Sequence, residues 1–196
     1  MSTTAYGGNP GDGQLGVVEA GIRTVHARLR DGTAVEVDTF SSFDIARGME
    51  LMNLVIREGK AWPFEEELDE KGYRAYFLTH AAFVVRRNGE KEVLGTFYVK
   101  PNFPGRCSHV CNGGFITAPE ARGNGVGRLM GTCFLDFARK LGYRAAYFNL
   151  VFKSNEASVR LWESLGFSRV AEIPKCARLL DIGDDTAYGY YYDLES

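Results

Sequence analysis

A glycine-rich run directly before an apolar helical pattern is the feature that most constrains this chain. The run is Arg122-Gly123-Asn124-Gly125-Val126-Gly127-Arg128, and apolar residues at helical spacing follow it as far as Leu141. Glycines at the start of a helix let main-chain N–H groups approach an anion closely. The unpaired amides and the positive end of the helix dipole favour negative charge there, and Arg122 and Arg128 can add charge-assisted contacts. The run therefore predicts a site for a pyrophosphate.

Two common phosphate-binding loops do not match this run. A P-loop ends in Gly-Lys-Ser or Gly-Lys-Thr, and neither occurs in the chain. A dinucleotide fingerprint G-x-G-x-x-G that began at Gly123 would need a glycine where Arg128 stands. The pattern that remains is R-x-x-G-x-G.

Composition limits the classes of protein that this chain can belong to. Its 196 residues are 45% hydrophobic and 24% charged, which is typical of one globular domain. A net charge of −2 argues against nucleic acid as a partner. No apolar run is long enough to span a membrane, and no secretion signal opens the chain, so we expect a cytoplasmic protein. The glycine-rich residues 1–20 are expected to form a flexible tail before a single domain over 21–196.

The order of periodic segments predicts an α+β fold, with one mostly antiparallel sheet flanked by helices. In it, the segment 110–151 forms a strand–glycine loop–helix–strand crossover. Such a crossover brings the helix start to the end of its strand, where small-molecule clefts commonly form. Expected strands are 23–29, 33–40, 81–87, 93–100, 110–117, 143–151, 167–173 and 188–194. Expected helices run from Ser41 or Ser42 to about Glu58, over 64–79 after Pro63, over 125–141 and over 154–165.

Cys107, His109 and Cys111 alternate in the sequence, which raises the question of a metal site. In an extended strand their side chains would share one face, roughly 6–7 Å apart, too far to converge on one zinc ion. No fourth ligand is apparent. We therefore expect no metal.

The second half of the chain resembles the GNAT superfamily of N-acetyltransferases. Besides R-x-x-G-x-G, the segment Gly114-Phe115-Ile116-Thr117-Ala118-Pro119 occupies the place of the superfamily's fourth strand, and Asn155-Glu-Ala-Ser158 resembles its N-x-x-A/S segment. The resemblance implies a GNAT fold and acetyl-CoA as cosubstrate. It implies that the backbone of Phe115, Ile116 and Thr117 pairs with the pantetheine arm, that residues 122–128 hold the pyrophosphate, and that Asn155 faces coenzyme A.

A narrower resemblance is to the fungal acetyltransferases that detoxify proline analogues such as azetidine-2-carboxylate. It rests on the segments 94–102, 106–112 and 148–152, and it is weak over the first 80 residues. It implies that Asn112 and Asn149 take part in substrate handling and catalysis. It also suggests a homodimer.

These assignments leave alternatives open. Asn112 and Asn149 can instead be structural asparagines bonded to neighbouring backbone, since an unpaired buried amide costs roughly 1–3 kcal/mol. Asn155 can simply start its helix, with Ser154 as N-cap. Trp162 stands where many GNAT enzymes have a tyrosine that protonates the leaving thiolate, and an indole cannot act as that acid.

The general base is also open. His80 and His109 are candidates by their ordinary pKa, and a water relay is another. Glu65, Glu66 and Glu67 crowd an expected helix start, where carboxylates are favoured anyway, and receive no role.

The expected function is transfer of acetyl from acetyl-CoA to the amine of a small molecule, with a proline-like or other amino-acid-like secondary amine as the specific candidate. One alternative is a protein or peptide N-acetyltransferase. The other is a non-catalytic acyl-CoA-binding module, for which Trp162 in place of tyrosine is the argument.

Overall fold

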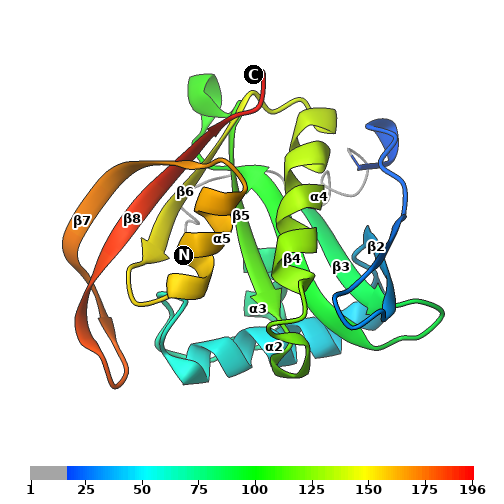
Figure 1. Ribbon diagram of the computed structural model, residues 1–196, viewed down its shortest axis with the longest axis horizontal. Coiled ribbons are helices and arrows are strands. Elements are labelled where there is room, and N and C mark those ends of the chain that lie inside the picture. Colours follow the sequence, from blue (N-terminus) through cyan, green and yellow to red (C-terminus); the bar gives the residue numbers. More distant parts are fainter. Residues whose placement is uncertain (1–16) are drawn as a thin grey trace.

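A computed structural model describes residues 17–196, which form one sheet with helices on both of its faces (Figure 1). The eight strands lie in the order β1-β2-β3-β4-β5-β6-β8-β7, and every neighbouring pair is antiparallel except β5 with β6. The strands are β1 (Val25–Arg28), β2 (Ala34–Thr39), β3 (Ala81–Arg87), β4 (Val93–Pro101), β5 (Val110–Thr117), β6 (Ala145–Phe152), β7 (Ser168–Leu179) and β8 (Gly183–Asp193). The helices are α2 (Ile45–Glu58), α3 (Glu70–Phe77), α4 (Val126–Lys140) and α5 (Glu156–Ser164). The predicted α+β class and the crossover are confirmed.

Neighbouring residues of β4 show how the two layers of helices are placed. Phe97 packs against Phe137 of α4, with ring centroids 6.2 Å apart, while Tyr98 packs against Phe77 of α3 at 5.0 Å. Because side chains alternate across a strand, α4 and α3 cover opposite faces of the sheet. α5 packs against β6 and α4, and α2 against α3, β4 and β5.

Helix α4 has the boundaries that the sequence predicts. It begins directly after Gly125, whose φ of 98° is the left-handed conformation that favours glycine. Its buried face includes Met130, Phe134 and Phe137. It ends at Lys140, and Gly142 follows at a φ of 83°.

Strands β5 and β6 diverge almost immediately, and this divergence creates the site. They pair only through Val110 with Ala145 and Cys111 with Ala146. Beyond that point β5 continues to pair with β4 as far as Thr117, while β6 pairs with β8. The edge of β5 that faces β6 therefore keeps main-chain N–H and C=O groups open along most of its length.

The expected helix over 64–79 was wrong at its start. The helix begins at Glu70, because the Asp69 side chain caps it by accepting a hydrogen bond of 2.7 Å from the Gly72 N–H. Residues 59–69 form a loop that Asn53 ties to α2 through two hydrogen bonds with the Leu68 backbone, of 2.8 and 2.9 Å. Glu65, Glu66 and Glu67 thus lie in this loop and not at a helix start.

The start of α2 and the hairpin of β7 and β8 also differ from expectation. Ser41 bonds to Asp44 at the start of a 3₁₀ turn (Ser42–Asp44), and α2 itself begins only at Ile45. The last two strands form a longer hairpin than expected, because β7 continues through Pro174. Pro174 lies in a bulge of this edge strand, between Ile173 and Ala177, where its missing N–H is tolerated.

The predicted tail over residues 1–20 lies outside the described residues except for 17–20, and of these Val17 is buried in the core.

Cys107 is exposed in a 3₁₀ turn, whereas Cys111 is buried in β5. Within residues 17–196, no cluster of His, Cys, Asp or Glu has the arrangement of a metal site. In the same range, no helix combines the length and the apolarity needed to cross a membrane.

Candidate active site

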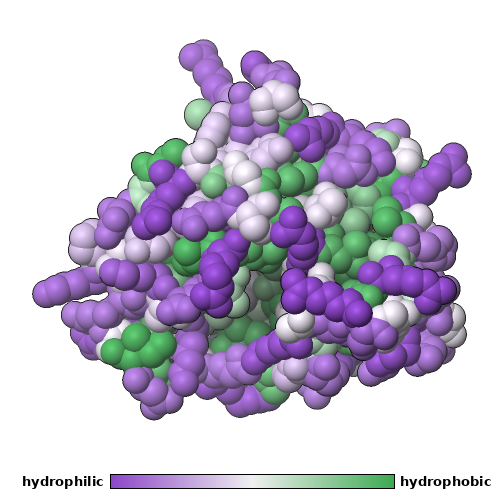
Figure 2. All heavy atoms as spheres, in the orientation of Figure 1, coloured by the Kyte–Doolittle hydropathy of each residue, from purple (hydrophilic) through white to green (hydrophobic). Residues whose placement is uncertain are grey.

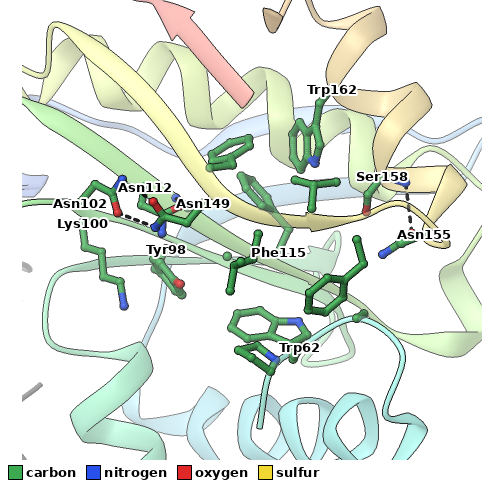
Figure 3. Close-up of a pocket in the computed structure, with 18 of the residues that line it drawn as sticks. Trp62, Tyr98, Lys100, Asn102, Asn112, Phe115, Asn149, Asn155, Ser158 and Trp162 are labelled. Atoms are coloured by element: carbon green, nitrogen blue, oxygen red, sulfur yellow. Dashed lines mark hydrogen bonds between the residues drawn. The ribbon is translucent and has the colours of Figure 1, made fainter. Parts of the chain in front are cut away.

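A cavity of about 260 Å³ lies where β5 and β6 diverge, and the surface is hollowed between apolar walls on the face shown in Figure 2. Figure 3 shows that side chains from both strands, from α5 and from the loop after α2 surround it. Its lining comprises Ala61, Trp62, Pro63, Tyr76, Tyr98, Lys100, Pro101, Asn102, residues 112–115, residues 148–152, Asn155, Ser158 and Trp162. The cavity thus brings together Asn112, Phe115, Asn149 and Asn155, all named by the sequence.

Two glycines of β5 are required by aromatic packing. A Cβ at Gly113 would lie 2.6 Å from the Phe134 ring, and one at Gly114 would lie 2.5 Å from Trp62. Phe115 lines the cavity, whereas Ile116 is buried in the core and does not. The pairing with the pantetheine arm that is expected of Ile116 and Thr117 therefore involves only their main-chain atoms.

The glycine loop continues from the end of β5 into α4. The first helical hydrogen bond runs from the Leu129 N–H to the Gly125 carbonyl, at 3.0 Å. The N–H groups of Val126, Gly127 and Arg128 therefore precede the helical ladder and have no acceptor within it. Gly123 has a φ of 78°, and a Cβ built there would meet no atom within 4 Å. The loop is thus an open cradle of N–H groups at a positive helix end, which fits a pyrophosphate.

The loop's polar side chains are partly engaged elsewhere. Arg122 pairs with Glu58 of α2 at 2.9 Å, and Arg128 donates to Ser164 of α5 at 2.9 Å. Asn124 holds the β1–β2 turn, since its side-chain oxygen accepts from the Asp31 N–H at 3.1 Å. Its side chain therefore has a structural partner.

Arg30 is a cation at this loop that sequence reasoning missed. It donates from Nη1 to the Gly123 carbonyl at 3.3 Å, and its side chain passes Gly125. It precedes the loop by 93 positions, so only the folded β1–β2 turn brings it there.

Asn149 pairs with a second asparagine. Asn102 donates to Asn149 Oδ1 at 2.9 Å, and Asn149 donates to Asn102 Oδ1 at 2.7 Å. A bulge in β6 at 149–150, where the register with β8 shifts, directs Asn149 to this partner. Asn102 is 1% exposed and also donates to the Tyr147 carbonyl at 3.2 Å. Asn102 was missed because its own segment is a loop and its partner is 47 positions away.

The pairing of Asn102 with Asn149 can be tested through the stability of the protein. We expect Asn102→Ala and Asn149→Ala each to lower the free energy of unfolding by about 1–3 kcal/mol, because each removes both hydrogen bonds between the two amides. The double variant is expected to cost less than the sum of the two. Urea unfolding of the four proteins measures this. Additive losses would contradict the pairing.

Asn155 caps helix α5. Its side-chain oxygen accepts from the Ser158 N–H at 3.2 Å, and its side chain faces the cavity in Figure 3. Ser154 is not the N-cap, because its hydroxyl donates instead to Asp185, at 2.8 Å.

Trp162 is 4% exposed and packs between Phe115 and Phe148, with ring centroids 4.7 Å from each. It lines the cavity as an apolar wall beside the β5 edge. Neither His80 nor His109 lines the cavity. Burial, and then the charge of Lys100, lower the pKa of His80, while His109 is exposed.

One end of the cavity carries three titratable groups. The hydroxyls of Tyr76 and Tyr98 lie 3.3 Å apart, and burial raises the pKa of both. The Lys100 ammonium lies over their rings, at 4.3 and 4.4 Å from the centroids, and burial lowers its pKa to about 8. Lys100 is therefore mostly cationic at neutral pH.

Asn112 neighbours Lys100 across the strand pair. Its side-chain oxygen accepts from the Gly113 N–H at 2.8 Å, which leaves its NH₂ group as a donor. Asn112 therefore has a bond to neighbouring backbone and lines the cavity as well.

Comparison with known proteins gives consistent matches. A family model described as the acetyltransferase (GNAT) family matches residues 49–167. N-acetyltransferase aca1 of Schizosaccharomyces pombe is 48% identical over 105 residues, which are 53% of this chain and 50% of that protein. Protein SPT10 of Saccharomyces cerevisiae is 36% identical over 90 residues, 46% of this chain and 14% of that protein. The chain thus spans half or less of the length of these relatives.

Solved structures match over more of the chain. A GCN5-related N-acetyltransferase from Kribbella flavida has a TM-score of 0.77 and 27% identity, over 81% of this chain and 97% of that one. The acetyltransferase yncA of Salmonella typhimurium, solved with acetyl-CoA, has a TM-score of 0.72 and 21% identity, over 82% and 94%. At 21% identity, the likeness to yncA shows a shared fold only.

Proposed function

Because the chain belongs to the GNAT family of acetyltransferases, we propose that it transfers acetyl from acetyl-CoA to the amine of a small molecule. A proline-like or other amino-acid-like secondary amine is the specific candidate. The observation that carries the proposal is the open edge of β5, which runs from the cavity to the N–H cradle before α4. One continuous surface therefore offers partners for a pyrophosphate, an amide-containing arm and an acceptor.

The residues around this surface divide into two sets. Arg30, Arg122, Arg128 and the N–H groups of residues 123–128 would hold the pyrophosphate, while the backbone of 115–117 and Asn155 would hold the arm. Bound acetyl-CoA supplies an activated thioester. Asn112 and Asn149 would then orient the acceptor amine. Because positioning alone can supply much of the rate, no nucleophilic side chain is required.

The cavity supports a small acceptor over a peptide. Its volume of about 260 Å³ is modest, and Trp62 of the loop after α2 closes one side of it. A chain-like acceptor would need an open groove instead.

We further propose a cytoplasmic homodimer, for which the exposed apolar side chains Val170 and Ile173 on edge strand β7 are the support.

The test is an acceptor panel. Acetyl-CoA is incubated with azetidine-2-carboxylate, proline, primary amino acids and short peptides, and free thiol is measured against a reaction without amine. We expect thiol release above background with a cyclic amino acid. Faster reaction with peptides would favour the protein N-acetyltransferase alternative. Binding of acetyl-CoA without turnover of any amine would favour the non-catalytic module.

A further inference from the structure

We propose that Lys100 is the anchor for a carboxylate on the acceptor, so that the cavity selects amines that carry a free acid group. This inference rests on the proposed function of the same cavity. It adds a specificity-determining residue that the sequence motifs did not single out.

Lys100 is a cation without a carboxylate partner among residues 17–196. It lines the cavity and is half-buried over two tyrosine rings. Among residues 17–196, lysine ion pairs occur at Lys60 and Lys140 only, and no carboxylate pairs with Lys100. A shielded charge is costly unless something compensates it, and two ring faces compensate it only in part. An anion that enters the cavity would complete the pairing.

Asn112 offers a neutral hydrogen-bond donor on the same face of the sheet as Lys100. Asn112 stands directly opposite Lys100 in the β4–β5 register, and therefore on the same face of the sheet. Its side-chain oxygen is held by the Gly113 N–H, so its NH₂ group is the donor. A carboxylate that reaches both groups would take a charge-assisted hydrogen bond from the ammonium at one oxygen and a hydrogen bond from the amide NH₂ at the other.

Lys100 is poorly placed to act as a base for the amine. Its ammonium is held at the ring faces of Tyr76 and Tyr98, and in Figure 3 it lies below the Asn102–Asn149 pair and away from Asn155 and Trp162. It is cationic at neutral pH, and a cation attracts an acid group and repels an ammonium. The free acid is thus favoured over an amide or a peptide.

The test measures equilibrium binding, so that it does not depend on turnover. The probes are N-acetyl-proline, N-acetyl-alanine and their carboxamides, titrated by calorimetry with coenzyme A present. We expect at least one acid to bind about 30-fold more tightly than its amide, the difference that one charged hydrogen bond gives. Lys100→Met is expected to abolish this preference and Lys100→Arg to keep part of it. Lys91→Met, which removes an exposed lysine near Phe43, is the matched control and keeps it in full.

The pH dependence gives an independent readout. The groups facing the ammonium are Tyr76 of α3, Tyr98 of β4 and His80. The pKa of His80 is lowered and those of both tyrosines are raised, so Lys100 itself titrates near pH 8. Binding of the acid needs the ammonium and weakens as pH rises above about 8. In Lys100→Arg it stays level over the same range, because the guanidinium keeps its charge.

The outcomes separate this inference from the proposed function. If no acid binds more tightly than its amide, or if Lys100→Met keeps the preference, the anchor is wrong even where amines are acetylated. If Lys100→Met slows acetylation of free acids and amides equally in the panel assay, Lys100 acts as a base and the anchor is again wrong. If the preference depends on Lys100 but no amine is acetylated, the anchor stands and the proposed acetyl transfer falls.

Discussion

We expect Gly125→Glu to bind acetyl-CoA at least about 100-fold more weakly than the wild-type protein. Gly125 stands at the N-cap of α4, with a φ of 98°, beside the N–H groups that form the cradle. A glutamate there brings a negative charge against the pyrophosphate, and a like-charge juxtaposition costs several kcal/mol. Isothermal calorimetry of both proteins measures the effect.

The matched control for this change is Gly142→Glu, at the opposite end of the same helix. Gly142 also has a positive φ, of 83°, and a Cβ there meets nothing within 4 Å. It therefore carries a similar backbone strain without approaching the cradle. We expect it to bind acetyl-CoA as the wild type does. Affinity of Gly125→Glu within threefold of the wild type would contradict the loop assignment.

We expect Asp44→Asn to lower the free energy of unfolding by about 2–4 kcal/mol. Asp44 receives two hydrogen bonds from Arg86, of 3.0 and 2.6 Å, and two from Ser41. Its side chain is 4% exposed and that of Arg86 is 13% exposed. Removing one partner of a shielded pair leaves the other charge poorly compensated. Asp38, 3.5 Å from Arg86, limits the loss.

The stabilisation that ionised Asp44 contributes depends on pH. Burial opposes ionisation of Asp44, but the hydrogen bonds from Arg86 and Ser41 outweigh it and hold its pKa below the ordinary value. The folded pKa is depressed, so this stabilisation is present above about pH 4 and is lost as pH falls through the folded pKa. Urea unfolding at pH 7 and pH 3 measures it. Glu195→Gln breaks an exposed pair with Arg144 and is the control, with an expected loss much smaller than that of Asp44→Asn. Equal losses for the two variants would contradict the buried pair.

The sequence predicted well those helices whose ends and apolar face are set by neighbouring residues. Gly59 ends α2 at a φ of 62°, and Gly125 and Gly142 bracket α4, because only glycine adopts these left-handed conformations without strain. The pattern of α4 is also strong, since one face is apolar throughout. These elements needed no information from distant residues.

The elements that the sequence misplaced depend on contacts between distant segments. Pro63 and three following glutamates resemble a helix start, yet Asn53 holds Leu68 in a loop and Asp69 is the real cap. The strand expected over 167–173 stops before Pro174, yet β7 continues because its outer edge has no partner strand that would need the missing N–H. In both cases tertiary structure overrides a local signal.

The candidate site divides in the same way. The glycine loop, Asn112, Asn149 and Asn155 were predicted from motifs, and the three asparagines line the cavity. Arg30, Asn102 and Lys100 were not found as site residues, because their role appears only through partners on other strands. Tyr98 and Tyr76 precede Lys100 by two and by 24 positions, so nothing in the sequence links the three residues. The folded chain shows that Lys100 is half-buried against both rings and has no carboxylate partner among the described residues.

A comparison of acetyl-CoA with acetyl-pantetheine, which lacks the nucleotide diphosphate, tests how the cosubstrate is held. The claim is that main-chain N–H groups before α4 hold that diphosphate while the edge of β5 holds the arm. We predict that acetyl-CoA binds in calorimetry and raises the melting temperature by several degrees at about 100-fold excess over Kd, and that acetyl-pantetheine binds at least about 100-fold more weakly. Absence of heat and of thermal protection with acetyl-CoA near saturation, or equal affinity for the two ligands, would contradict it.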